Sequence, residues 1–250
     1  MANVRSLINA IRYRTNTLLN IDFVRASGQH TLRTHMVSVL RKYMIEKVID
    51  VGASEGGFGT QLRSLGFHGD IYSFEPVKDA YDRLTETASA DSKWTTFNFA
   101  LGAERNISTI NVSRFTQFSS LLPASKYGTD RWVNLEIAKR QTIEVRTLDD
   151  VVAEGLIPST ARYLLKMDTQ GYDLEVFKGS SIIRPQICCM LSELSLIPIY
   201  EGMPHYIESL SVYEKAGFMV SGFYPITRNA DLALNEVDCM MVRPEQMVAK

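Results

Sequence analysis

The segment from Val48 to Gly59, with the sequence VIDVGASEGGFG, constrains the fold of this 250-residue chain most strongly. It begins with a short apolar run rich in β-branched residues, which is typical of a buried strand. Glycines then interrupt the run, and Phe58, Leu62 and Leu65 follow at helical spacing. A strand, a glycine turn and a helix bring backbone close to a ligand and direct helix-start N–H groups at it. The segment therefore predicts an α/β fold with a ligand site at the turn.

Two glycine patterns compete for this turn. A dinucleotide-binding fold uses G-x-G-x-x-G, but Ser54 occupies the middle position between Gly52 and Gly57. The pattern D-x-G-x-x-x-G is met by Asp50, Gly52 and Gly56. A carboxylate inside an apolar strand is costly unless a cationic or hydrogen-bonding group meets it. An acid at this place suits the ammonium group of S-adenosylmethionine (SAM) better than it suits a diphosphate.

Composition narrows the function classes. The chain is 45% hydrophobic and 22% charged, as in soluble globular proteins, and its formal net charge of −1 disfavours a nucleic-acid partner. No run reaches the ~18 apolar residues of a membrane span, and the N-terminus lacks the apolar core of a secretory signal. The three cysteines are interpreted as buried thiols of a cytoplasmic protein, namely Cys188, Cys189 and Cys239.

A second acid, Glu75, follows the glycine turn at the spacing typical of a ribose-binding acid. Glu75 ends the apolar run 71–75, 23 positions after Gly52. An acid at the tip of the second strand can bind a ribose diol through two hydrogen bonds. The alternative is a structural acid near the N-terminus of the predicted helix 78–87. Ala100 leaves the third strand, 94–99, where strand order places the adenine.

Two more acids end apolar strands further along the chain. Asp168 follows the strand that contains Lys166, and Glu193 lies near the end of the strand 187–194. Because ligands of open parallel sheets bind beyond the strand C-termini, both acids are candidates for chemistry. Asp168 could instead cap the helix that follows. His205 is a weaker candidate base, and a surface position at a helix start suits it better.

The remaining segments predict the domain organisation. Residues 1–46 form a helical extension, and residues 47–250 form the main domain with an insertion at about 107–146. The last two strands, 217–220 and 237–242, are separated only by a loop, so they should pair antiparallel. A mostly parallel sheet closed by one antiparallel strand is the layout of SAM-dependent methyltransferases.

Eight motifs occur in one order along the chain: VIDVGASEGGFG at 48–59, YSFEP at 72–76, FALG at 99–102, Ser119-Ser120, RTLDD at 146–150, LLKMDTQGYDLEVFKG at 164–179, LSEL at 191–194 and EVDCMMVR at 236–243. Together they resemble the FkbM family of SAM-dependent methyltransferases. The family pattern K-x-D-x-x-G-x-E places a glutamate where this chain has Asp173, with Glu175 following. Either acid could therefore carry that family role.

The resemblance implies a Rossmann-like class I methyltransferase fold. Its sheet would be mostly parallel and seven-stranded with one antiparallel strand, accompanied by N-terminal helices and a β-hairpin insertion. The implied reaction is O-methylation of a hydroxyl on a sugar, glycan or small natural product. The implied SAM contacts are the methionine end for Asp50, Gly52, Ser54 and Gly56, the ribose for Glu75, and the adenine for Ala100. The residues implied to face the acceptor are Lys166, Asp168 and Glu193.

An alcohol nucleophile benefits from a base or from a metal ion that lowers its pKa. Asp168 is the first candidate for either role, Glu193 the second and Lys166 a weaker third. Asp168 and Glu193 could share Mg²⁺ or another divalent cation, since hard cations take carboxylate oxygens. The expected partner is a small-molecule or glycan acceptor, and a homo-oligomer stays open. The alternative functions are a non-catalytic SAM-fold binding module and a nicotinamide-dependent oxidoreductase.

Overall fold

The computed structural model describes residues 31–132 and 135–244. The chain divides into two compact units, Met1–Ser38 and Val39–Lys250. Helix α2 (Leu32–Lys42) begins in the first unit and ends in the second. Most of the predicted helical extension, residues 1–30, lies outside the described residues.

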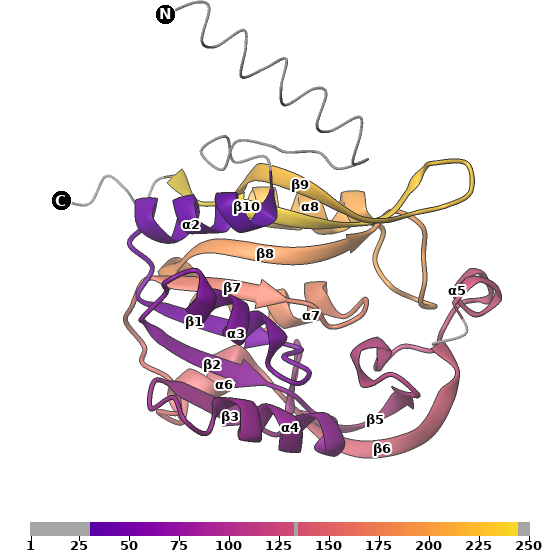
Figure 1. Ribbon diagram of the computed structural model, residues 1–250, viewed down its shortest axis with the longest axis horizontal. Coiled ribbons are helices and arrows are strands. Elements are labelled where there is room, and N and C mark those ends of the chain that lie inside the picture. Colours follow the sequence, from indigo (N-terminus) through magenta and orange to yellow (C-terminus); the bar gives the residue numbers. More distant parts are fainter. Residues whose placement is uncertain (1–30, 133–134, 245–250) are drawn as a thin grey trace, which may run out of the picture. The chain divides into compact units, whose positions relative to one another are not determined.

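A seven-stranded sheet forms the centre of the second unit, in the order β3-β2-β1-β7-β8-β10-β9 (Figure 1). The pairs from β3 through to β8 are parallel, whereas β10 runs antiparallel to both β8 and β9. This confirms the predicted mostly parallel sheet with one antiparallel strand. Its strands are β1 (Lys47–Val51), β2 (Asp70–Phe74), β3 (Trp94–Phe97), β7 (Tyr163–Met167), β8 (Ile187–Ser195), β9 (Met219–Arg228) and β10 (Leu234–Val242).

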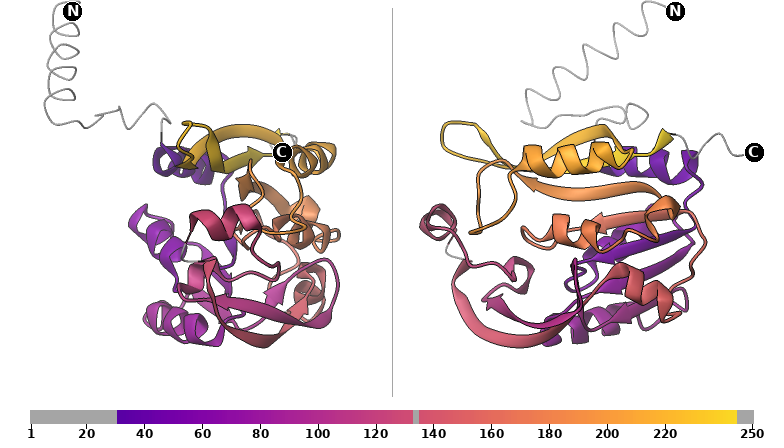
Figure 2. Two further views of the ribbon diagram at one scale, coloured as in Figure 1. Left: turned by 90° about the vertical axis from the view of Figure 1, so that its right-hand side faces the viewer. Right: turned by 180° about the vertical axis from the view of Figure 1, so that it is seen from behind.

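Helices cover both faces of this sheet, as the two views of Figure 2 show. Helices α3 (Gly57–Ser64) and α4 (Lys78–Ala88) lie on one face. The other face carries α6 (Leu148–Ala153), α7 (Asp173–Lys178) and α8 (Tyr206–Lys215). The main hydrophobic core lies between these last three helices and the strands, and its aromatic centre consists of Phe177, Tyr213 and Phe218.

The predicted insertion contains a β-hairpin. Strands β5 (Asn106–Ser113) and β6 (Ile137–Arg146) pair antiparallel, and β4 (Ala100–Leu101) joins β6 to complete a three-stranded sheet. The segment between β5 and β6 includes the short helices η2 (Thr116–Phe118) and α5 (Lys126–Arg131). A further short helix, η4 (Arg184–Gln186), precedes β8.

The last hairpin is longer than the sequence predicts. Residues 224–236 were expected to form a loop, but β9 continues to Arg228 and β10 begins at Leu234, where these two residues pair. The loop prediction was wrong because cross-strand pairing extends regular structure through polar and proline-containing sequence. Among the described residues, no helix combines the length and apolar character needed to cross a bilayer. All three cysteines are buried thiols, as predicted.

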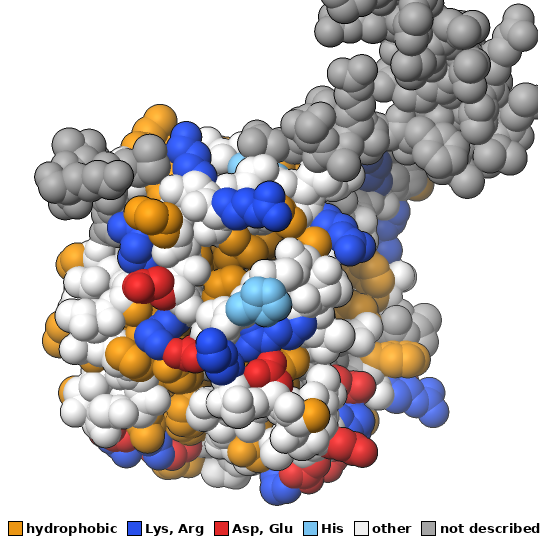
Figure 3. All heavy atoms as spheres, turned by 60° about the vertical axis from the view of Figure 1, so that its left-hand side comes forward, with side chains coloured by type: hydrophobic (Ala, Val, Ile, Leu, Met, Phe, Trp, Pro, Cys, Tyr) orange, Lys and Arg blue, Asp and Glu red, His pale blue; other side chains and the backbone are white. Residues whose placement is uncertain are grey.

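Basic and acidic side chains lie close together on the face shown in Figure 3, at the amino-terminal ends of the strands. Lys47 forms an ion pair with Asp70, and Arg63 Nε lies 2.6 Å from Asp91 Oδ2. The candidate ligand site lies at the opposite, carboxyl-terminal ends of the strands.

Candidate functional site

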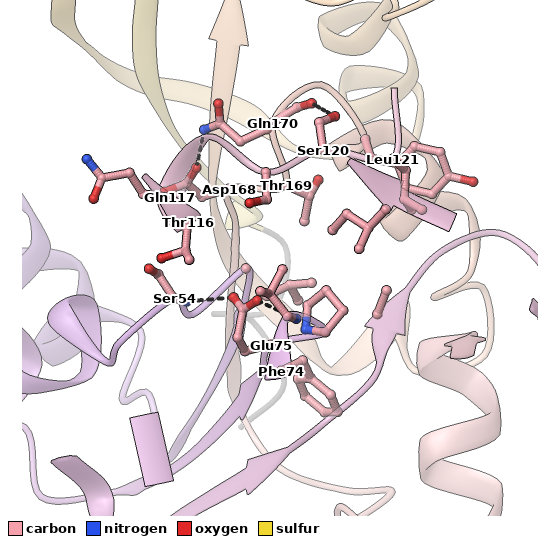
Figure 4. A pocket seen from close by; sticks show the side chains of 18 of the residues that line it. Ser54, Phe74, Glu75, Thr116, Gln117, Ser120, Leu121, Asp168, Thr169 and Gln170 are labelled. Atoms are coloured by element: carbon pink, nitrogen blue, oxygen red, sulfur yellow. Dashed lines mark hydrogen bonds between the residues drawn. The ribbon is translucent and has the colours of Figure 1, made fainter. Parts of the chain in front are cut away.

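A cavity of about 630 Å³ opens at the carboxyl ends of β1, β2 and β7 (Figure 4). Its walls come from the turn after β1, the end of β2, β4, the segment between β5 and β6, and the residues after β7. Of the residues predicted to contact a cofactor, four line it: Gly52, Ser54, Glu75 and Ala100.

The turn after β1 requires glycine because the backbone of the β7 exit approaches it closely. A Cβ at Gly52 would lie 2.0 Å from the carbonyl oxygen of Asp168, and its φ of +72° also disfavours other residues. Ser54 has a φ of +48°, and its backbone N–H donates to Glu75 Oε2 at 2.8 Å. Gly56 lies at the N-cap of α3 against Trp94, and is not among the described residues that line the cavity.

Glu75 is held by backbone donors at both of its carboxylate oxygens. Oε1 accepts the N–H of Val77 at 2.8 Å, and Oε2 accepts that of Ser54. The side chain is 6% exposed. Burial raises the pKa of Glu75 to about 7, although the two backbone hydrogen bonds oppose that change. This carboxyl can therefore switch between a protonated and an ionised form near neutral pH.

Asp50 lies beneath the cavity. It is fully buried, and strand register places it between Lys166 on β7 and Ser73 on β2. Lys166 Nζ lies 3.0 Å from Asp50 Oδ1, and Ser73 Oγ donates to Asp50 Oδ2 at 3.1 Å. The same lysine donates to the carbonyl of Gly52 at 3.0 Å. Asp50 therefore supports the glycine turn through Lys166, and its predicted direct contact with SAM remains a prediction.

Lys166 is 6% exposed and shares its charge between two acids. Its Nζ is 3.6 Å from Asp168 Oδ2 in addition to the contact with Asp50. Burial alone would lower the pKa of Lys166, but the adjacent carboxylates raise it, so the ammonium form persists. A permanently charged lysine stabilises anionic carboxylates and is a poor base. The prediction that Lys166 takes part in catalysis is therefore best understood as electrostatic support for Asp168.

Asp168 and Glu193 come together at the ends of β7 and β8, as strand order predicts. The side-chain amide nitrogen of Gln170 lies 3.0 Å from Asp168 Oδ1 and 3.0 Å from Glu193 Oε2. Burial favours the neutral form of Asp168, but Lys166 and hydrogen bonds from Glu193 and Gln170 hold its pKa below the usual value. Burial and the charge of Asp168 raise the pKa of Glu193 well above its usual value. The surroundings therefore favour the ionised form of Asp168 and the protonated form of Glu193.

Asp173, rather than Glu175, occupies the buried position after the glycine turn. Asp173 accepts hydrogen bonds from the backbone and hydroxyl of Thr169, from Ser192 Oγ and from the backbone N–H of Glu193. Glu175 instead pairs with Lys178 within its own helix. Of the two acids, Asp173 is therefore the one whose contacts tie the residues after β7 to β8, and which acid carries the family role remains a prediction.

The described residues contain no group of three or more His, Cys, Asp or Glu side chains arranged to hold a metal ion. Asp168 and Glu193 could supply two carboxylate ligands, but the amide of Gln170 lies between them. Metal binding at this pair remains a prediction. His205 caps the N-terminus of α8 and is not among the described residues lining the cavity, so the structure supports the surface interpretation.

From the sequence, the loop 114–140 within the insertion could be a substrate loop or simply a hairpin arm, and Gln170 had no predicted role. Thr116, Gln117 and Ser119 line the cavity from the segment between β5 and β6. Ser120 Oγ donates to the backbone carbonyl of Gln170 at 2.7 Å, which joins the insertion to the β7 exit (Figure 4). The Ser119-Ser120 motif was a signal that the sequence offered, but only the folded chain shows which residue the serine reaches.

The family model described as "Methyltransferase FkbM domain" matches residues 50–220, which is more than half of the chain. A search of curated proteins finds no match. Similar solved structures include fibrillarin from Aeropyrum pernix with natively bound S-adenosyl-L-methionine (9% identity, 79% of this chain and 66% of that chain, TM-score 0.44). Another is the methyltransferase domain of bacterial CtHen1-CN (13% identity, 84% of this chain and 96% of that chain, TM-score 0.43). A third is an rRNA methylase from Streptococcus thermophilus (9% identity, 84% of this chain and 95% of that chain, TM-score 0.44).

Proposed function

The chain belongs to the FkbM methyltransferase family, and on that premise we propose that it transfers the methyl group of SAM to a hydroxyl oxygen of a small-molecule or glycan acceptor. One observation carries the cofactor assignment. Glu75 at the end of β2 lines the same cavity as the glycine turn after β1, and the Ser54 backbone N–H joins the two.

The cavity residues suit the separate parts of SAM. Glu75 is the acceptor group that a ribose diol requires at the tip of the second strand. Ala100, Leu101 and Ile110 give an apolar surface for the adenine ring. The glycine turn brings backbone to the methionine end, supported from below by Lys166 and Asp50. Each of these contacts is part of the proposal.

The acceptor hydroxyl would lie near Asp168. Methyl transfer forms an O–CH₃ bond as the C–S bond breaks, leaving neutral S-adenosylhomocysteine (SAH) and releasing the hydroxyl proton. The protein mainly aligns oxygen, carbon and sulfur and excludes water. Asp168 can take the proton because Lys166 favours its ionised form, whereas burial and the charge of Asp168 favour the protonated form of Glu193. A divalent cation, if one binds Asp168 and Glu193, would lower the pKa of the hydroxyl instead.

The proposal is tested by a screen for transfer of labelled methyl from SAM to glycans and hydroxylated natural products, with Mg²⁺ or with a chelator. We expect product from a hydroxylated acceptor, and a loss of turnover of at least about 100-fold in Asp168→Asn, since a positioned base contributes on that order. SAM binding should survive in this variant.

Each arm of the screen separates one part of the proposal. Wild-type turnover by Asp168→Asn would remove this residue as the base. Loss of wild-type turnover with the chelator, restored by Mg²⁺, would assign the activation to a metal. Methyl transfer to amine nitrogens only would overturn the hydroxyl acceptor while leaving SAM dependence intact.

A further inference from the structure

Gln170 holds the two acids of the candidate site in one hydrogen-bonded unit. Its side-chain nitrogen donates to Asp168 Oδ1 and to Glu193 Oε2, both at 3.0 Å. A primary amide carries two N–H hydrogens, so it can serve one carboxyl group with each. Figure 4 shows the Gln170 side chain beside Asp168 at the wall of the cavity.

The orientation of this amide is fixed from its other side. The hydroxyl of Tyr200, a buried residue, donates to Gln170 Oε1 at 2.8 Å. Reversing the amide would place its oxygen against two carboxyl groups and its hydrogens against the hydroxyl hydrogen. The backbone is fixed as well, because the carbonyl of Gln170 accepts from Ser120 Oγ and its φ is +54°.

Two carboxyl groups that share one amide donor repel each other when both are ionised, so the site needs contacts that hold each of them in place. Lys166 lies 3.6 Å from Asp168 Oδ2 and favours the anion there. Glu193 faces Asp238 across the β8–β10 pair, where like charges are unfavourable. An amide that donates to both groups holds them in fixed orientations without adding charge.

We propose that Gln170 is a positioning residue that holds the carboxyl groups of Asp168 and Glu193 in fixed orientations and directs Asp168 at the acceptor. This inference rests on the proposed function, because Asp168 accepts the hydroxyl proton there. Gln170 itself touches neither the methyl group nor the sulfur in this account. It acts through the acid that it orients.

The same residue connects the acids to the insertion. The Tyr200 hydroxyl oxygen also lies 3.2 Å from the carbonyl oxygen of Phe118, and its ring packs with Leu135 and Ile199 in one small apolar cluster. Ser120 Oγ additionally accepts the backbone N–H of Leu122. The contacts of Tyr200 and Ser120 with Gln170 therefore fix both the insertion wall of the cavity and the orientation of Asp168.

The test measures the titration of the acids directly and needs no acceptor. Carboxyl ¹³C signals of Asp168 and Glu193 are followed from pH 3 to 9 by NMR, assigned with Asp168→Asn and Glu193→Gln. Neighbouring charged and titratable groups will also affect the titration curves of Asp168 and Glu193. They are Lys166, Asp173, Tyr200, Glu236 and Asp238. In Gln170→Ala, we expect the titration of Asp168 to move up by about one pH unit, because a hydrogen bond to the ionised form is lost.

The variant Gln170→Asn tests the same loss with less risk of misfolding, because asparagine tolerates the left-handed φ at this position. Its shorter side-chain amide cannot reach both Asp168 and Glu193. The matched control is Gln117→Ala, which removes a second glutamine from the cavity wall and should leave the titration of Asp168 in place. Tyr200→Phe should produce a smaller upward shift than Gln170→Ala.

The outcomes separate this inference from the proposed function. An unshifted Asp168 titration in both Gln170 variants, with the fold intact by circular dichroism, would overturn the positioning role. Binding of SAH to the wild-type protein is measured alongside by calorimetry. If the titration shifts as expected but the wild type does not bind SAH, the hydrogen bonds from Gln170 to the two acids stand, and the methyltransferase proposal fails together with the part of Gln170 in it.

Discussion

At the residue scale, the buried carboxylate of Glu75 is positioned to accept hydrogen bonds from the ribose diol of the proposed cofactor. Its two oxygens already accept one backbone N–H each, from Ser54 and Val77, and their remaining lone pairs are available to the cavity. Burial raises the pKa of Glu75 to about 7, so the ligand-free protein holds a mixture of both forms near neutral pH. A diol that donates two hydrogen bonds should draw the carboxyl into its ionised form.

Replacing Glu75 with glutamine should weaken SAH binding by about 10- to 100-fold, since a hydrogen bond to a charged group contributes about 1.5–3 kcal/mol. The new amide hydrogens would also face a backbone N–H. Isothermal titration calorimetry measures the change, and the exposed Glu86→Gln on α4 is the matched control. An affinity within twofold of the wild type would exclude Glu75 from the ribose site.

The pH dependence of binding follows from the same pKa. Only the ionised carboxyl accepts both diol hydrogens, so SAH affinity should fall about tenfold between pH 8 and pH 6 as Glu75 takes up a proton near pH 7. Because the folded pKa lies above the unfolded value, this group favours the folded state at low pH. That contribution is lost as the pH rises through about 7. In Glu75→Gln the pH slope of binding should flatten.

At the element scale, α7 and β8 are joined through one acid at the start of the helix. Asp173 accepts four hydrogen bonds from three residues, including the backbone N–H of Glu193. Asp173→Ala should lower the free energy of unfolding by about 3 kcal/mol, because buried donors lose their acceptor. Glu175→Ala should change it by less than about 0.5 kcal/mol, since its ion pair is exposed to water.

Urea unfolding at pH 7 measures both variants under one set of conditions. Equal effects of the two substitutions would show that Asp173 does not carry the structural role assigned to it. The comparison removes one carboxyl group from the first turn of the same helix in each variant, so the change in formal charge is matched.

The sequence predicted the elements that follow from local pattern, and missed the contacts that only tertiary pairing creates. The strands β1, β2, β7 and β8 were recognisable as apolar runs. Because these strands are parallel, the acids near their carboxyl ends lie at the same edge of the sheet. The partner of Asp50 was not evident, because Lys166 becomes its neighbour only through the register of β1 against β7. Gln170 carried no sequence signal, since its amide gains meaning only between Asp168 and Glu193.

At the scale of the whole molecule, one edge of the sheet gathers every contact on which the proposed function depends. The glycine turn, Glu75, the insertion wall and the Asp168–Glu193 pair all lie at the carboxyl ends of the strands. The insertion is part of this arrangement because it closes one wall and fixes Gln170 through Ser120. Below the site, the buried ion pair of Asp50 with Lys166 supports the turn through the hydrogen bond from Lys166 to the Gly52 carbonyl.

Selective binding of SAH tests the central claim most directly. Isothermal titration calorimetry on the wild-type chain, with SAH, SAM and NAD in parallel at pH 8, compares the cofactors on one sample. We expect SAH and SAM to bind at a single site with micromolar affinity, about −8 kcal/mol, and NAD to give no heat of binding. Binding of NAD without binding of SAM or SAH would contradict the account and indicate a nicotinamide-dependent enzyme.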